Sequence, residues 1–184
     1  MKELSLNILD ITENSVKAGA TLTEINLFET DEQLTLTITD DGCGMTAEML
    51  DSVTNPFTTT RTTRKVGMGL PLLKLAAEQT GGEVVITSKH IDEYPNEHGT
   101  VVKANFFKNH IDFTPLGDVT STITTLIQGH PDTDFLFVHT IGDYAVMLDT
   151  RELRETLEGI PLDTYEVIKW IEEYINEQYS EILK

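Results

Sequence analysis

The sequence has one cysteine, Cys43, among its 184 residues. A single cysteine excludes an internal disulfide framework and a four-cysteine zinc site, and it is typical of proteins in a reducing compartment. No apolar run approaches the roughly 20 residues that a membrane-spanning helix needs. The first residues contain acids and no small-residue cleavage site of the kind that ends a signal peptide. We therefore expect a cytoplasmic protein that does not enter a membrane.

Basic residues are also scarce, with 13 Lys and Arg against 31 Asp and Glu, a formal net charge of −18. This charge disfavours the phosphate contacts that bring proteins to nucleic acids or anionic lipids, so we expect neither as a partner. Residues 110–184 alone hold 15 acids and 4 bases, a net charge of −11. Residues 52–77 hold no acid, but they contain Arg61, Arg64, Lys65 and Lys74. This basic island is either a solvated loop or a site for a small anion.

Periodicity divides the first 109 residues into helices and strands. Apolar or small residues at steps of three and four predict a helix that starts near Leu4 and ends at Gly19. A second helix is predicted over Gly69–Thr80, and Thr46 can cap a short one. Alternating apolar residues predict four strands, at residues 23–28, 34–39, 84–89 and 101–107.

The pattern changes after Pro115. A helical stripe at about 116–127 precedes a predicted hairpin of residues 135–140 and 144–149, and two more helices follow. The last is expected to begin at a capping box formed by Asp163 and Glu166. Its aromatic residues Trp170, Tyr174 and Tyr179 either form the core face of that helix or dock a partner or a second copy of the chain. We predict two units, residues 1–109 and an acidic αββαα extension at 110–184.

Polar residues on the first helix share one face. Asp10, Asn14 and Lys17 stand at positions i, i+4 and i+7, so they lie side by side along the helix. This face could direct a carboxylate, a neutral amide oxygen and an ammonium into one cleft. An ordinary solvated face has the same pattern, and these residues alone do not distinguish the two.

A second polar feature follows the second predicted strand, in the sequence Asp-Asp-Gly-Cys-Gly of residues 40–44. A carboxylate accepts hydrogen bonds and donates none, so Asp40 would suit an exocyclic amino group. Gly42 and Gly44 would let the backbone approach a ligand closely. A plain turn is the alternative, since this composition is common in turns. A calcium-binding EF-hand is excluded, because no glutamate follows at the required position.

Residues 55–70 form a hydroxyl-rich, basic stretch that runs into glycines at the start of the second long helix. Backbone N–H groups at a helix N-terminus, together with nearby Arg and Lys, favour phosphate oxygens. The stretch lacks the Gly-Lys-Ser/Thr of a Walker A loop, and no strand leads into it as in a Rossmann turn. A fourth piece, Gly99-Thr100, opens a strand and carries little information alone.

In order and spacing, these four pieces resemble the GHKL superfamily of ATPases, named for gyrase, heat-shock chaperones, histidine kinases and mismatch-repair proteins. Residues 13–21, Glu-Asn-Ser-Val-Lys-Ala-Gly-Ala-Thr, resemble the Glu-Asn-Ser-Leu-Asp-Ala-Gly-Ala-Thr of mismatch-repair ATPases. Asp40-x-Gly42-x-Gly44 matches the adenine motif of the superfamily. Pro-Phe-Thr-Thr-Thr at 56–60, Gly-Met-Gly-Leu at 67–70 and Gly81-Gly82 are similar to sensor histidine kinases.

The resemblance implies ATP or ADP bound between the first helix and a flexible lid. Asn14 would ligate Mg2+, Asp40 would accept the adenine amino group, and Gly44 and Thr100 would border the base. The expected nucleotide contacts are Asn14, Lys17, Asp40, Gly42, Gly44, Met45, Thr58, Arg61, Lys65, Gly67, Met68, Gly69, Leu70 and Thr100. The implied fold is an α/β two-layer sandwich with a mixed, mostly antiparallel sheet and helices on one face.

Departures from the superfamily pattern bear on activity. One helical turn before Asn14, the hydrolytic members place a glutamate base, and Asp10 is one methylene shorter. Lys65-Val66 replaces the usual Gly-Thr. No helical hairpin with a phosphorylatable histidine precedes the domain and no large transducer domain follows, so we expect neither an autophosphorylating sensor kinase nor a DNA-processing enzyme. The remaining alternatives are a slow ATPase or protein serine/threonine kinase with Asp10 as base, and a non-catalytic ATP-dependent switch that engages a protein partner.

Overall fold

The structure is a computed structural model that describes residues 2–54 and 68–184. Its strands form one six-stranded sheet in the order β3-β4-β2-β1-β5-β6. The strands are β1 (Leu22–Glu29), β2 (Gln33–Asp40), β3 (Val84–Lys89), β4 (Gly99–Phe107), β5 (Asp134–Ile141) and β6 (Tyr144–Asp149). The helices of the described residues are α1 (Leu4–Lys17), α2 (Ala47–Thr54), α3 (Gly69–Gln79), α4 (Val119–Gly129), α5 (Thr150–Leu157) and α6 (Tyr165–Ile182).

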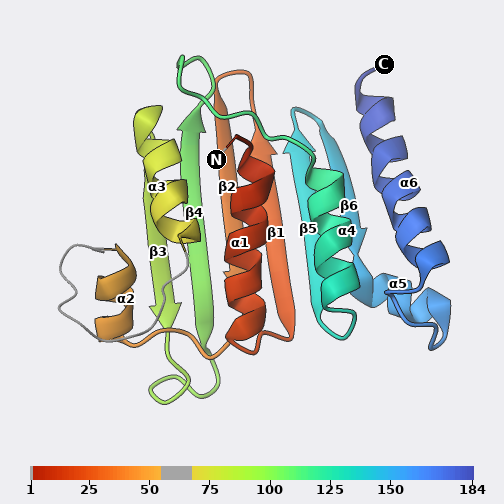
Figure 1. Ribbon diagram of the computed structural model, residues 1–184, viewed down its shortest axis with the longest axis horizontal. Coiled ribbons are helices and arrows are strands. Elements are labelled where there is room, and N and C mark those ends of the chain that lie inside the picture. Colours follow the sequence, from red (N-terminus) through yellow and green to blue (C-terminus); the bar gives the residue numbers. More distant parts are fainter. Residues whose placement is uncertain (1, 55–67) are drawn as a thin grey trace.

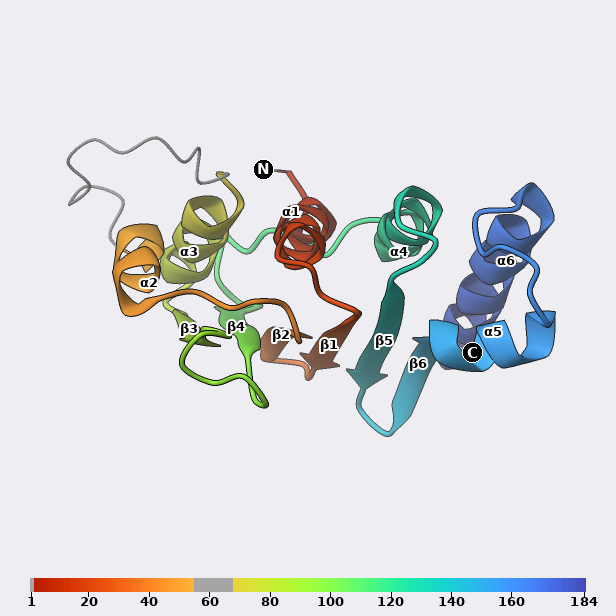
Figure 2. The ribbon, with the colours of Figure 1, turned by 90° about the horizontal axis from the view of Figure 1, so that it is seen from below.

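The long helices cover a single face of this sheet. Figures 1 and 2 show α3, α1 and α4 side by side over that face, with α6 beyond α4 near the β6 edge. Among the described residues, no helix lies over the opposite face in the view of Figure 2. Every pairing in the sheet is antiparallel except that between β1 and β5. The predicted sandwich with a mixed, mostly antiparallel sheet is therefore confirmed.

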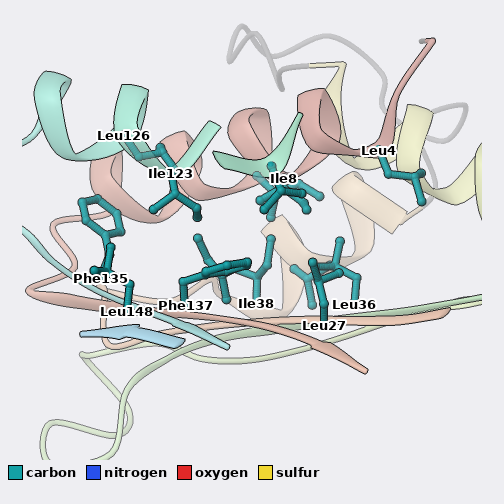
Figure 3. Packing of buried hydrophobic residues seen from close by; sticks show 14 of the residues in the cluster. Leu4, Ile8, Leu27, Leu36, Ile38, Ile123, Leu126, Phe135, Phe137 and Leu148 are labelled. Atoms are coloured by element: carbon teal, nitrogen blue, oxygen red, sulfur yellow. The ribbon is translucent and has the colours of Figure 1, made fainter. Parts of the chain in front are cut away.

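The core lies between the sheet and the helices because strand and helix patterns direct their apolar residues to the same layer. Alternate residues of β1 and β2 are buried, and Leu4, Ile8 and Ile11 of α1 pack onto them. Figure 3 shows Ile8 above Leu36 and Ile38, and Ile123 of α4 above Phe137. This packing fixes the rotation of α1, so the buried stripe points to the sheet and the polar face points away.

The C-terminal hairpin joins the sheet through a parallel pairing with β1. Leu22 pairs with Asp134 at one end and Glu29 pairs with Ile141 at the other. Strand β6 then forms the outer edge. One sheet therefore runs through both parts of the chain.

A polar network on the helix-covered side of the sheet connects α6 to β1. His139 is 2% exposed; its Nε2 lies 2.9 Å from Glu29 Oε2, and its Nδ1 lies 2.7 Å from the Tyr179 hydroxyl. Lys108 Nζ donates to Glu29 Oε1 at 2.6 Å. The hydrogen bond from His139, opposed by burial and supported by Lys108, lowers the pKa of Glu29 to about 2. Tyr179 is thus a structural contact between the last helix and the sheet.

The N-terminal ends of α2 and α6 differ in how they are capped. The predicted cap of the short helix is confirmed, since Met49 N–H donates to Thr46 Oγ1 at 3.2 Å. The capping box of the last helix is wrong: Thr164 is the N-cap residue, and no side chain caps that helix end. The Thr164 hydroxyl donates instead to the carbonyl of Pro161 at 2.6 Å. None of the described helices is long and apolar enough to cross a bilayer.

Candidate functional site

Helix α1 presents the predicted polar face. Asp10 and Lys17 are exposed and Asn14 is partly buried, while Ile11 and Ser15 on the neighbouring face are buried. Within the described ranges 2–54 and 68–184, no hydrogen bond or ion pair engages the side chains of Asp10, Asn14 or Lys17. The described residues therefore leave a carboxylate, an amide and an ammonium available to a ligand.

Asp40, the last residue of β2, is held by two hydrogen bonds. The Ser15 hydroxyl donates to Oδ2 at 2.7 Å, and the Gly42 N–H donates to Oδ1 at 2.9 Å. Ser15 is 4% exposed, so this bond is sheltered from water. Each carboxylate oxygen keeps a lone pair for a further donor. The arrangement is an oriented acceptor that suits the exocyclic amino group of a base.

Asp41 has a different function from its neighbour. It accepts hydrogen bonds from the backbone N–H groups of Thr21 and Leu22, at 2.7 Å and 3.0 Å, and from the Thr21 hydroxyl. Burial opposes the charged form, but the hydrogen bonds from Leu22 and Thr21 outweigh it and lower the pKa of Asp41. The second aspartate therefore secures the start of β1, and the first is left for a ligand.

Glycines in the turn after β2 and at the start of β4 are required by the packing of the protein's own backbone. A Cβ on Gly44 would lie 1.9 Å from the carbonyl oxygen of Lys89, and one on Gly99 would lie 2.0 Å from that of Asp40. Both have positive φ, at +71° and +139°. A Cβ on Gly42 would lie 2.9 Å from Cβ of Ala18 in the turn after α1. These glycines bring the turn against α1, β3 and β4.

Hydroxyl groups of β3 and β4 extend the site away from Asp40. Thr100 pairs with Asp40 across the β2–β4 ladder, so their side chains stand on the same face of the sheet. Thr100 Oγ1 lies 2.8 Å from Ser88 Oγ, which accepts from Met45 N–H at 2.7 Å. Thr100, expected to border the base, and Met45, expected to contact the nucleotide, are thus connected through Ser88.

The turn that carries Gly42 and Cys43 is also anchored by backbone contacts. His98 Nδ1 lies 2.6 Å from the carbonyl oxygen of Gly42. Cys43 N–H donates to the carbonyl of Ala18 at 2.9 Å, and the Cys43 carbonyl accepts from Ile91 N–H at 2.8 Å. The turn is therefore held between α1 and the loop after β3.

The N-terminus of α3 approaches α1 at Asp10. A Cβ on Gly69 would lie 2.9 Å from Cβ of Asp10, so only glycine allows this approach. Leu70 is buried, whereas Met68 is 66% exposed. The N-cap residue Met68 has no side-chain hydrogen bond to this end of α3, and among the described residues no other side chain bonds its first N–H groups. Thr58, Arg61, Lys65 and Gly67 lie outside the described residues.

The structure arranges the predicted residues in two groups. The residues expected on the adenine side of a nucleotide, called the adenine-side group, lie around the end of β2 and are Asp40, Gly42, Gly44, Met45 and Thr100. The residues expected on the phosphate side, called the phosphate-side group, are Asp10, Asn14 and Lys17 on the outer face of α1, with the α3 N-terminus at Gly69 beside Asp10. Ser15 connects the groups, because it follows Asn14 in α1 and bonds Asp40.

Sequence reasoning missed three side chains of the site: Ser15, Ser88 and His98. Ser15 places a hydroxyl group within the apolar stripe of α1. This exception to the pattern was the sequence signal that could have indicated its role in the site. Ser88 contacts Met45, 43 positions earlier in the chain, and His98 contacts Gly42, 56 positions earlier. No local pattern marks such long-range contacts.

A family model described as histidine kinase-, DNA gyrase B- and HSP90-like ATPase matches residues 1–111. The ATPase domain of Aquifex aeolicus MutL complexed with ADP is similar to this chain, with a TM-score of 0.55 at 15% identity, over 86% of this chain and 70% of that one. No curated protein matches the sequence.

A second solved structure, the N-terminal domain of a DNA repair protein, gives a TM-score of 0.52 at 16% identity and covers 81% of this chain. The present chain spans 53% of that protein's length. At these identities the likeness to both solved structures concerns the fold alone.

Proposed function

The chain belongs to the histidine kinase-, DNA gyrase B- and HSP90-like ATPase family, whose domains bind ATP, and we propose that it binds ATP with Mg2+ between α1, the turn after β2 and the N-terminus of α3. We further propose that it turns ATP over slowly, as an ATPase or a protein serine/threonine kinase. The observation that carries the proposal is the Asp40 carboxylate, oriented by Ser15 and Gly42 at 2.7 Å and 2.9 Å.

Adenine recognition is assigned to the adenine-side group. Asp40 offers a charged acceptor to the amino group, and Thr100 on the adjacent strand offers a hydroxyl that can donate or accept. A hydrogen bond to a charged partner contributes about 1.5–3 kcal/mol, twice the typical value for neutral pairs. Because the turn is already fixed by Ser88 and His98, little ordering is required when the base enters.

Phosphate and metal binding are assigned to the phosphate-side group. The side-chain oxygen of Asn14 is the kind of hard ligand that Mg2+ prefers, and few protein ligands suffice because triphosphate and water supply the rest. Bound in this way, Mg2+ would neutralise phosphate charge. Lys17 and the N–H groups at the start of α3 add positive charge on the same side.

Asp10 is the proposed general base. It would take the proton of a water molecule or of an acceptor hydroxyl, whose oxygen then attacks the γ-phosphorus while ADP leaves. A base must come within about 2.6–3.2 Å of that proton's oxygen, directly or through one water. Asp10 is shorter than glutamate, so an intervening water is the arrangement that its position favours. Slow turnover follows.

A non-catalytic switch is the second candidate function. The observation that favours it is that the Asp10 carboxylate is exposed and has no orienting hydrogen bond from the described residues. In this case ATP closes the site, and the acidic C-terminal part engages a protein partner without turnover.

A single incubation separates the candidates: the purified chain with ATP and Mg2+, with released phosphate, labelled protein and bound nucleotide all measured. Released phosphate alone indicates an ATPase, and label on an added or endogenous protein indicates a kinase. Stoichiometric ATP binding with neither product, alone or with candidate partners, supports the switch. Absence of ATP binding by the folded chain overturns the proposal as a whole.

A further inference from the structure

A groove lies at the β6 edge of the sheet, far from the strands that carry the candidate nucleotide site. It has a volume of about 180 Å³ and is bounded by β6, α5 and α6. Its walls include Met147 from β6, Glu152 and Leu153 from α5, and Trp170 and Tyr174 from α6. The volume is below the roughly 300 Å³ of the smallest typical ligand pockets, so it suits one or two protein side chains rather than a cofactor.

The aromatic wall of the groove is exposed. Trp170 and Tyr174 are 48% and 38% exposed, and their rings stack at 4.9 Å with an interplanar angle of 10°. Met147, on the adjacent strand, is 45% exposed. The core-face interpretation of these two aromatic residues is therefore wrong, because Val167, Ile171 and Ile175 form the buried face of α6. Stacked aromatic rings beside a methionine are typical of the centres of protein interfaces.

The edge of β6 is closed to strand addition at this point. Gln178 of α6 accepts a hydrogen bond from Met147 N–H at 3.0 Å and donates one to the Met147 carbonyl at 3.0 Å. The outward backbone groups of Met147 are thus satisfied within the chain. An occupant must therefore bind through side chains that enter the groove.

Charge identifies the class of occupant. Asp149 is paired with Arg151 through Oδ2 at 2.8 Å, whereas the Glu152 carboxylate forms no ion pair with any residue in the described parts of the chain. Residues 110–184 carry a net charge of −11. A second copy of this chain, a nucleic acid or an anionic membrane would be repelled by that charge. A basic segment would be attracted, and an Arg side chain could also stack on the aromatic wall.

We propose that this groove binds a segment of a partner protein in which an aliphatic or aromatic residue is flanked by Lys or Arg. The apolar side chain fills the space between Leu153 and Trp170, and the flanking cation pairs with Glu152. This surface shares no residue with the adenine-side or phosphate-side groups, so it can be tested without nucleotide.

Trp170 is the single tryptophan of the chain, so its fluorescence reports on the groove directly. The probes are three pools of acetylated, amidated octapeptides with Leu or Phe at the centre, flanked by Arg and Lys, by Ser, or by Asp. We expect the basic pool alone to give a saturable change in Trp170 emission that weakens as salt is added. Glu152→Lys should reduce the affinity at least threefold. Glu172→Lys, the same charge change on an α6 residue outside the groove, should reduce it less.

Circular dichroism and thermal unfolding establish that both variants are folded before they are compared. Failure of every pool to saturate the signal overturns the proposal, as does equal binding of the Ser or Asp pool. Equal losses of peptide affinity in Glu152→Lys and Glu172→Lys would show that the effect depends on net charge alone. This result would also overturn the proposal. A Trp170 shift that depends on protein concentration alone, with dimers in sedimentation, would assign the groove to a second copy instead.

Discussion

Two carboxylates of the candidate site stand in opposite situations. Asp40 accepts a hydrogen bond on each oxygen, from Ser15 and from Gly42, and is partly buried at the end of a strand. Asp10 is exposed on α1, and no described residue bonds its side chain. A group that recognises a base benefits from orientation before the ligand arrives. A group that moves a proton needs freedom to meet its substrate. Under the proposed function, the adenine-side group is therefore preorganised, and the phosphate-side group is completed by the nucleotide.

The largest effect should come from substitution of Asp10. Asp10→Asn keeps the shape of the side chain and removes its basicity, so phosphate release or transfer should fall by about 10²–10⁴-fold, the usual contribution of a general base. ATP affinity in calorimetry should stay within a few fold. Glu13→Gln is the matched control, because Glu13 is an acid of the same helix that pairs with His130 at 2.8 Å. Wild-type turnover in Asp10→Asn would remove Asp10 from catalysis.

The second effect should appear in binding and not in turnover of bound ATP. Asp40→Asn replaces a charged acceptor by an amide, a loss of about 1.5–3 kcal/mol. ATP affinity measured by calorimetry should fall about tenfold or more. A folded Asp40→Asn protein with wild-type affinity would contradict the assignment of the adenine side.

The third prediction concerns the metal. Asn14→Ala removes the neutral oxygen ligand, so the increase in ATP affinity that Mg2+ produces in the wild type should disappear. Binding of ATP without metal should be unchanged, because Asp40 and Thr100 are intact. A variant that keeps the full Mg2+ dependence would move the metal away from Asn14, with Asp10 as the next candidate ligand.

A smaller effect should follow from loss of one bond to Asp40. Ser15→Ala removes the hydrogen bond at 2.7 Å and leaves the carboxylate in place. A typical hydrogen bond contributes about 0.5–1.5 kcal/mol, so ATP affinity should fall roughly twofold to tenfold. Ser5→Ala is the control, because Ser5 is a buried serine of the same helix, 2% exposed, that bonds Glu3 instead. Equal losses in the two variants would attribute the effect to helix stability.

The smallest effect on ATP binding should come from substitution of Asp41, the residue after Asp40. Asp41→Asn should leave ATP affinity unchanged and lower the free energy of unfolding at neutral pH. Folding lowers the pKa of Asp41 from 3.8, so the charged form stabilises the fold above pH 3.8, and this stabilisation is lost as pH falls through the lower pKa of the folded state. Denaturant unfolding of both proteins should therefore differ at pH 7 and converge in acid. A constant difference across pH would contradict this account.

The sequence alone determined the secondary structure elements and the order of the motifs. Helix α1 and the strands follow from apolar spacing, and the pieces at 10–17, 40–44 and 67–70 indicated the family before any tertiary contact was known. These features are local, because helix and strand periodicity and turn chemistry act over a few residues. The failed capping box shows the limit even at short range, since Thr164 and not Asp163 is the N-cap residue.

Only the tertiary structure decided which segments meet. The parallel pairing of β5 with β1 joins residues more than 100 positions apart, and the bond between Ser15 and Asp40 joins residues 25 positions apart. The groove beside Trp170 exists because the buried stripe of α6 turns two aromatic residues outward. The physical reason is that such contacts depend on how whole elements pack onto the sheet, and this packing is set by the summed burial of the core rather than by the residues that form the contact.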